Sequence, residues 1–127
     1  MHADAVRAVS TLLSRGDRVC IIPQNLIEFW AVCTRPVANN GLGLTPAQTE
    51  AEVSKVESLL TLLPDSPAIY PEWRRLVVAH AVSGKQVHDT RIIAAMAVHK
   101  IANLLTFNVD DFKRFSGITL INPLSIK

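Results

Sequence analysis

The sequence lacks several features that define particular protein classes. Its two cysteines, Cys20 and Cys33, lie inside apolar runs without the CxxC spacing of a zinc or redox site. No apolar stretch is long enough to span a bilayer, and the first residues carry no apolar signal-peptide core. There is also no glycine-rich phosphate loop, zinc-type histidine pair or nucleophile-elbow serine. We therefore expect a soluble, cytoplasmic protein whose cysteines pack as small core residues.

Charged residues are scarce as well. Asp, Glu, Lys and Arg make up 19% of the 127 residues, whereas 49% are hydrophobic. This balance excludes a disordered chain, and the length suits a single domain over residues 1–127 with a buried core. The net charge of +2 is too small to indicate a nucleic-acid partner by itself.

The apolar pattern alternates between helical and strand periods. We expect helices over residues 3–14, 24–34, 46–63, 71–82 and 89–100, with Pro23 just before the second of them, and a turn or short helix over 110–115. We expect strands over 18–22, 103–106 and 118–121, with a short strand or extended segment at 62–67. Strands separated by helices predict an α/β fold with a parallel sheet flanked by helices on both faces.

Glu28 is the only charged residue between Pro23 and Thr34. The helix expected there is apolar on every face, so we expect Glu28 to be buried. A buried carboxylate needs a cation or hydrogen-bond donors beside it. A metal ion in a cleft would meet that need, and a structural salt bridge to an arginine such as Arg91 is the alternative.

Two more acidic sites lie near the ends of other apolar segments. Asp89 begins one expected helix, and Asn108, Asp110 and Asp111 follow a strand. Because ligands of parallel α/β sheets gather at the carboxyl ends of the strands, these residues and Glu28 should meet at one edge. Oxygen ligands of this kind suit Mg²⁺ or Mn²⁺, so the sequence suggests a divalent-metal centre. Taken singly, Asp89 is better explained as a helix N-cap, and Asp110 and Asp111 as turn residues.

Basic residues flank the acidic segments. Lys85, Arg91, Lys113 and Arg114 would suit contacts to the phosphate backbone of RNA beside a metal ion. An ordinary solvated surface explains these side chains equally well.

Three segments together resemble the PIN-domain family, and specifically the VapC-type toxins of bacterial type II toxin–antitoxin pairs. The segments are residues 22–30, 84–95 and 105–112, which contain Glu28, Asp89 and Asn108. Their order and spacing agree with the family over nearly the whole chain. The resemblance therefore implies a PIN-like parallel sheet flanked by helices.

The resemblance also implies a metal-dependent ribonuclease that hydrolyses RNA phosphodiesters with the help of Mg²⁺ or Mn²⁺. Carried over to this chain, the catalytic positions are Glu28, Asp89, Asn108 and Asp111. The implied metal ligands are Glu28, Asp89 and Asp110, with Asp110 and Asp111 as substitutes for the acid that many relatives have at position 108. Thr106 would hold the loop by hydrogen bonding, and the implied RNA contacts are Lys85, Arg91 and Lys113.

The sequence departs from the family pattern at its start. PIN domains begin with a central strand whose Asp-Thr-Asn-type motif supplies the first metal-binding Asp, whereas this chain opens in a helix. Asp4 and Asp17 stand in other contexts, so neither takes that role. We expect a gene start upstream of Met1 or a truncated relative, and weak metal binding with weak or no cleavage by this chain. A missing central strand would also expose sheet edges and favour self-association.

A second interpretation is a catalytically inactive PIN-like module that binds an antitoxin, RNA or another copy of itself. The family resemblance implies a homodimer, and an antitoxin that binds a groove lined by the early helices. The helix expected over residues 3–14 and the Phe29/Trp30 face are therefore candidate contacts. A purely structural α/β domain is the third interpretation.

Overall fold

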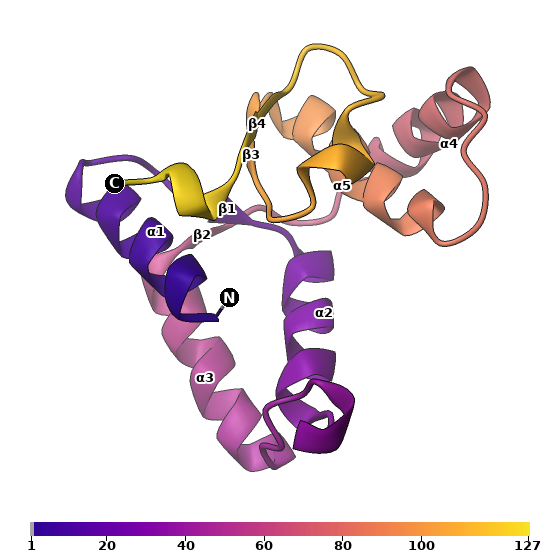
Figure 1. The fold of residues 1–127 in the computed structure, drawn as a ribbon. Coiled ribbons are helices and arrows are strands. Elements are labelled where there is room, and N and C mark those ends of the chain that lie inside the picture. The colour runs from indigo at the N-terminus through magenta and orange to yellow at the C-terminus, as the bar shows by residue number, and fades with distance from the viewer. Residues whose placement is uncertain (1) are drawn as a thin grey trace. The chain divides into compact units, whose positions relative to one another are not determined.

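The computed structural model describes residues 2–127, which divide into two compact units (Figure 1). Unit 1 contains residues 2–17 and 65–127, and unit 2 contains Arg18–Pro64. Both units combine helices with short parallel strands, which confirms the predicted α/β class. Across the described residues, the helices are too short or too polar to cross a membrane.

Unit 2 is a pair of helices joined to a pair of parallel strands. Its elements are β1 (Cys20–Ile21), α2 (Pro23–Thr34), the 3₁₀ helix η1 (Val37–Asn39), α3 (Pro46–Leu59) and β2 (Thr61–Leu62). Cys20 lies opposite Thr61 in the parallel register. The Leu63 amide donates to the Ile21 carbonyl at 2.8 Å and extends this ladder by one residue.

The start of α3 follows from its sequence. The Thr45 hydroxyl accepts from the Gln48 amide at 3.1 Å, and the Gln48 side chain accepts from the Thr45 amide at 2.9 Å. This reciprocal capping box satisfies two amides at the helix start. The predicted end at residue 63 is wrong, because Leu60 is extended (φ −109°, ψ 157°) and Thr61 donates to the Val19 carbonyl at 2.9 Å. Strand pairing therefore replaces the last helical turn.

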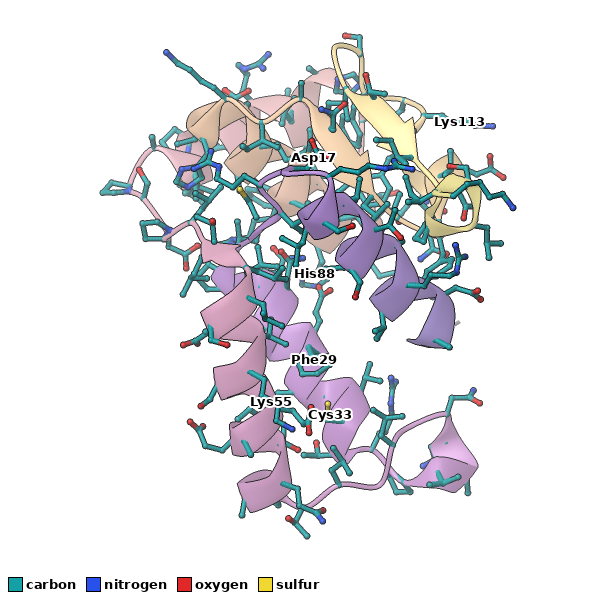
Figure 2. All side chains as sticks on the ribbon, turned by 90° about the vertical axis from the view of Figure 1, so that its left-hand side faces the viewer. Asp17, Phe29, Cys33, Lys55, His88 and Lys113 are labelled. Atoms are coloured by element: carbon teal, nitrogen blue, oxygen red, sulfur yellow. The ribbon has the colours of Figure 1, made fainter. Side chains whose placement is uncertain are left out.

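The core between α2 and α3 includes Cys33 and Thr49, both fully buried. The Thr49 hydroxyl donates to the Thr45 carbonyl at 2.9 Å, so its burial leaves no unpaired hydroxyl. Burial, and then the negative charge of Glu52, raise the pKa of the Cys33 thiol. Figure 2 marks Cys33 on α2 and Lys55 on the neighbouring α3. Cys33 is therefore the small core residue that the sequence predicts, and Cys20 is half-buried.

Unit 1 contains the remaining helices and a second pair of parallel strands. Its elements are α1 (His2–Ser14), α4 (Ile69–Ala79), α5 (Gln86–His99), β3 (Asn103–Leu105), the 3₁₀ helix η2 (Val109–Phe112), β4 (Thr119–Ile121) and the 3₁₀ helix η3 (Pro123–Ser125). In β3 and β4, Leu104 lies opposite Leu120. The Thr106 amide donates to the Ile121 carbonyl at 2.9 Å just beyond β3.

The core of unit 1 lies where α4 packs against α5 (Figure 1). Its buried residues include Ile69 and Leu76 from α4, and Ile93 and Met96 from α5. The other end of the chain closes on α1, where Arg7 donates to the Ile126 carbonyl at 2.7 Å. Unit 1 is therefore stabilised by apolar packing between α4 and α5 and by a hydrogen bond between the two ends of the chain.

Three helix boundaries in unit 1 differ from prediction. The α4 helix begins at Ile69 rather than 71 and ends at Ala79 rather than 82. Pro71 is tolerated in the first turn because amides there have no helical partner, and Ala81 turns the chain with φ +49°. The α5 helix begins at Gln86, three residues before the predicted start.

Candidate functional site

The segment after β3 forms a short, polar turn into η2. The Asn108 amide donates to the Thr106 hydroxyl at 3.0 Å, and the Asp111 amide donates to the Asn108 carbonyl at 3.1 Å. The first bond joins the Thr106 side chain to the loop that follows β3. The side chains of Asn108, Asp110 and Asp111 are exposed, while Phe112 is buried and anchors η2 to the core.

Asp110 already has a cationic partner within this turn. The Lys113 ammonium lies 2.6 Å from the Asp110 carboxylate. That hydrogen bond, together with the charge of Lys113, holds the pKa of the Asp110 carboxyl below its usual range. Asp110 would have to leave Lys113 to bind a metal ion, whereas Asp111 is exposed and has no such ion pair in the described part of the chain.

Asp89 lies in the first turn of α5 and is half-buried. Lys85 occupies the N-cap position, so the alternative explanation of Asp89 as a cap is wrong. A carboxylate in the first turn is stabilised by the positive end of the helix dipole. The next residue, Thr90, is buried and donates to the Gln86 carbonyl at 2.9 Å, which fixes the turn that holds Asp89.

A hydrogen bond links these two segments. The Arg114 guanidinium donates to the Gln86 side-chain oxygen at 2.6 Å, and α5 packs against η2. Unit 1 therefore brings the start of α5, which carries Asp89, close to the η2 segment. Sequence reasoning missed the Arg114–Gln86 bond, because a single polar contact between distant residues leaves no periodic pattern.

Glu28 lies in unit 2 on the exposed side of α2, so the prediction that it is buried is wrong. Its carboxylate accepts from the Gln24 side chain at 3.1 Å. The apolar residues around it are also partly on that surface, since Ile27 is 70% exposed and Val32 is 36% exposed. The apolar sequence of α2 predicts a helix that is buried on all sides. In the described chain, one side of α2 is covered and the side with Glu28 is exposed.

The predicted RNA contacts differ in their partners. Arg91 lies 3.1 Å from the Asp65 carboxylate within unit 1. Lys113 pairs with Asp110, and Arg114 is bonded to Gln86. Lys85 is exposed at the start of α5. Of this set, Lys85 is therefore the side chain with the least competition for an added phosphate.

Neither unit holds a ready metal centre by itself. Within the described residues of unit 1, and likewise within unit 2, no three His, Cys, Asp or Glu side chains gather where they could hold one ion. Two surface hollows in unit 1 are lined by residues other than the predicted site residues. The oxygen donors are of the kind that Mg²⁺ and Mn²⁺ prefer, but within each unit too few of them gather to fit such an ion.

A family model of the PIN domain matches residues 2–118. The chain belongs to the PIN-domain family. The match runs through both units and includes Glu28, Asp89 and the turn at Asn108. PIN domains are generally divalent-metal-dependent nucleases that act on RNA or other nucleic acids, so this chain is a member of a nuclease family. Comparison with curated proteins gave no match.

Proposed function

We propose that this PIN domain is a cytoplasmic ribonuclease of the VapC type, the toxin of a toxin–antitoxin pair, with weak or no activity in this chain. The observation that carries the proposal is the family match over residues 2–118, which includes the α5 start and the η2 turn. The packing of α5 against η2 supports it, because it holds Asp89 and Asp111 on neighbouring segments. The reaction is hydrolysis of an RNA phosphodiester.

The proposed roles follow the chemistry of the side chains. Glu28 and Asp89 bind the metal ion or orient its water, and Asn108 with Asp111 complete the polar edge. Asp110 serves only after it is released from Lys113. When bound, the Mg²⁺ or Mn²⁺ ion would stabilise negative charge on the phosphate. Lys85 and, after release from their partners, Arg91 and Lys113 contact the RNA backbone.

We expect weak metal binding and weak or no cleavage by this chain, because Asn108 stands where many relatives have an acid. A strand with an Asp-Thr-Asn-type motif, added at the N-terminus, would supply a further carboxylate. The test measures cleavage of a labelled RNA pool in Mn²⁺ and in EDTA. It compares the chain as given with a version carrying such a strand at its N-terminus.

We expect Mn²⁺-dependent cleavage from the extended version and little from the chain as given. In the extended version, Asp89→Asn and Glu28→Gln should each lower the rate about 100-fold or more, since even outer partners of metal ligands contribute 10- to 100-fold. Asp17→Asn is the matched control and should leave the rate unchanged, because Asp17 follows α1 and has no assigned role. Cleavage that persists in EDTA, or that survives Asp89→Asn, contradicts the proposal.

A second candidate is an inactive binding module, and the amide of Asn108 in place of an acid favours it. Its partners would be an antitoxin, a second copy or RNA, with α1 and the Phe29/Trp30 face as contacts. The test measures retention of the chain on immobilised RNA in EDTA and its mass in solution. Retention on RNA without cleavage by either version supports an RNA-binding module. A dimeric mass in solution without retention on RNA supports a protein-binding module.

A further inference from the structure

The outer face of α4 is more apolar than a solvent-facing helix needs to be. Ile69 and Leu76 point into the core of unit 1 and are 1% and 7% exposed. Tyr70 and Val78 lie on another side of the helix and are 62% and 76% exposed. Core packing therefore does not explain why apolar residues stand at positions 70 and 78. Exposed apolar patches of this kind commonly mark surfaces that bind another molecule.

These exposed residues form one stripe along α4. Residues 70, 74 and 78 are spaced at i, i+4 and i+8, so Tyr70, Arg74 and Val78 share one side of the helix. A shallow hollow runs along this side. We call it the α4 outer face, and its lining residues are Tyr70, Pro71, Arg74, Arg75, Val78 and Ala79. The exposed side of α3 differs, since it carries polar residues such as Glu50, Ser54 and Glu57.

The aromatic end of the α4 outer face is held in place. The Tyr70 ring stacks on Trp73 with ring centres 5.8 Å apart and an angle of 27° between the planes. The Trp73 indole in turn donates to the Val87 carbonyl of α5 at 2.7 Å. A side chain that is already ordered loses little freedom on binding, so Tyr70 is suited to be an anchor.

The charge at the centre of the face belongs to Arg74. The neighbouring Arg75 is held by the Glu72 carboxylate through two contacts of 3.1 and 2.5 Å, so that pair is neutral. Arg74 is exposed, and within residues 2–127 its guanidinium makes no ion pair or side-chain hydrogen bond. The face therefore presents two apolar contacts with one uncompensated cation between them. Its complement is an apolar stripe with a carboxylate at its centre.

This pattern distinguishes between occupants. If two copies packed their α4 helices antiparallel about a twofold axis, Tyr70 would contact Val78 of the other copy. Arg74 would then contact Arg74 of the other copy, which places like charges together. An RNA strand would stack on Tyr70, but Val78 offers no aromatic surface for a second base. An amphipathic helix can contact all three residues. Its apolar side chains recur at the same spacing as Tyr70 and Val78, and an acidic side chain between them can pair with Arg74.

We propose that the α4 outer face is a docking site for an acidic amphipathic helix of another protein. Tyr70 and Val78 contact the apolar stripe of that helix, and Arg74 pairs with a carboxylate at its centre. The site is separate from the residues proposed for RNA cleavage, so it stands whether or not the chain is a nuclease.

The test is selection from a displayed library of helical peptides. The peptides carry fixed leucines at helical spacing and randomised polar positions, and the target is the immobilised full chain. We expect enrichment of Asp or Glu beside the leucine stripe. Anisotropy with a labelled winning peptide should then show at least about 10-fold weaker binding to Val78→Glu, the loss that corresponds to one good interface contact.

A charge swap tests the role of Arg74. Arg74→Glu should weaken the acidic peptide about 10-fold, and a peptide with Lys in place of its central acid should regain affinity for this variant. Lys55→Glu on α3 is the matched control, because it makes the same charge change at an exposed helix position and should leave binding unchanged. Circular dichroism of each variant confirms that the fold is retained.

Four outcomes would overturn the proposal. One is the absence of enriched peptides, and another is enrichment of Lys or Arg instead of acids. The third is displacement of the peptide by single-stranded RNA together with RNA binding that Val78→Glu removes, which would assign the face to RNA. The fourth is a dimer in sedimentation that Val78→Glu dissociates, which would assign the face to a second copy.

Discussion

The two units hold the residues predicted for one site in different ways. In unit 1, the turn from β3 into η2 is fixed by the Thr106–Asn108 bond and is tied to α5 through Arg114 and Gln86. In unit 2, Glu28 lies on an exposed helix side with the neutral Gln24 as its hydrogen-bond donor. Unit 1 therefore provides an ordered platform, and unit 2 provides an acid on an open surface. A helix that is apolar in sequence need not be buried, and an exposed turn can still be well ordered.

The two tryptophans allow each unit to be followed separately. Trp30 lies on α2 of unit 2, and Trp73 lies on α4 of unit 1. Trp30→Phe leaves Trp73 as the fluorescent reporter of unit 1, and Trp73→Phe leaves Trp30 as the reporter of unit 2. Trp73→Phe also removes the bond to the Val87 carbonyl, so stability changes are compared within one background.

The largest effect is expected from Ile93→Ala in unit 1. Ile93 is 4% exposed in the core between α4 and α5, so truncation leaves a cavity and should lower the free energy of unfolding by about 3 kcal/mol. Urea unfolding followed through Trp73 measures this change. Ile27→Ala on α2 is the control, and it is followed through Trp30 because Ile27 lies in unit 2. Ile27 is 70% exposed, so its truncation should change stability by no more than about 0.5 kcal/mol. Equal effects of the two changes would mean that α2 is as well packed as α5.

A smaller effect is expected from Thr45→Ala in unit 2. The change removes the hydroxyl that accepts from the Gln48 amide, and loss of an N-cap typically costs about 1 kcal/mol. Urea unfolding followed through Trp30 measures it. Ser54→Ala, at an exposed position of α3, is the control and should not destabilise, because alanine favours helices. An unchanged midpoint for Thr45→Ala would show that Pro46 alone fixes the helix start.

Thr106→Val should loosen the η2 turn at a cost of about 0.5 kcal/mol, because the exposed Asn108 amide can bond to water instead. Hydrogen exchange of the Asn108 amide should become faster, while the core amides of α5 keep their protection. Thr119→Val, at an exposed strand position, is the control. Unchanged exchange at Asn108 would show that the Asp111 amide bond is sufficient to hold the turn.

The smallest effect concerns pH. The hydrogen bond from Arg75 lowers the pKa of the Glu72 carboxyl. Glu72 therefore adds stability that is present above the ordinary carboxyl pKa and is lost as pH falls through the lowered value. Arg75→Gln should move this pKa upward and remove that loss at acid pH. Carbon-detected NMR titration measures the pKa of the Glu72 carboxyl. The pKa of the Asp110 carboxyl, which Lys113 lowers, should not change and serves as the control.

Much of the fold was predictable because local chemistry determines it. The end of α2 at Thr34 matches the prediction, since Pro36 follows it, whereas the helix begins at Pro23 itself rather than just after it. The start of α3 follows from Thr45 and Pro46. The ends of α3 and α4 were wrong because strand pairing at Thr61 and the turn at Ala81 act against helical propensity.

The site was predictable only in part. The strand-edge rule does not account for the position of Asp89, because α5 follows α4 rather than a strand. The exposure of Glu28 did not follow, because an apolar pattern without polar faces cannot show which side of a helix is left uncovered. The partners of Asp110 and Arg91 also depend on rotamers that sequence spacing does not determine. The i, i+4, i+8 spacing of Tyr70, Arg74 and Val78 was visible in the sequence and could have indicated the α4 outer face.

The buried thiol of Cys33 allows the opening of unit 2 to be measured by chemical labelling. With no exposed surface and a raised pKa, the thiol of the closed protein is shielded from alkylating reagents. Each labelling event therefore records a moment when α2 and α3 have separated. In a Cys20→Ala background, the labelling rate divided by that of an unfolded peptide gives the fraction of time that unit 2 spends open.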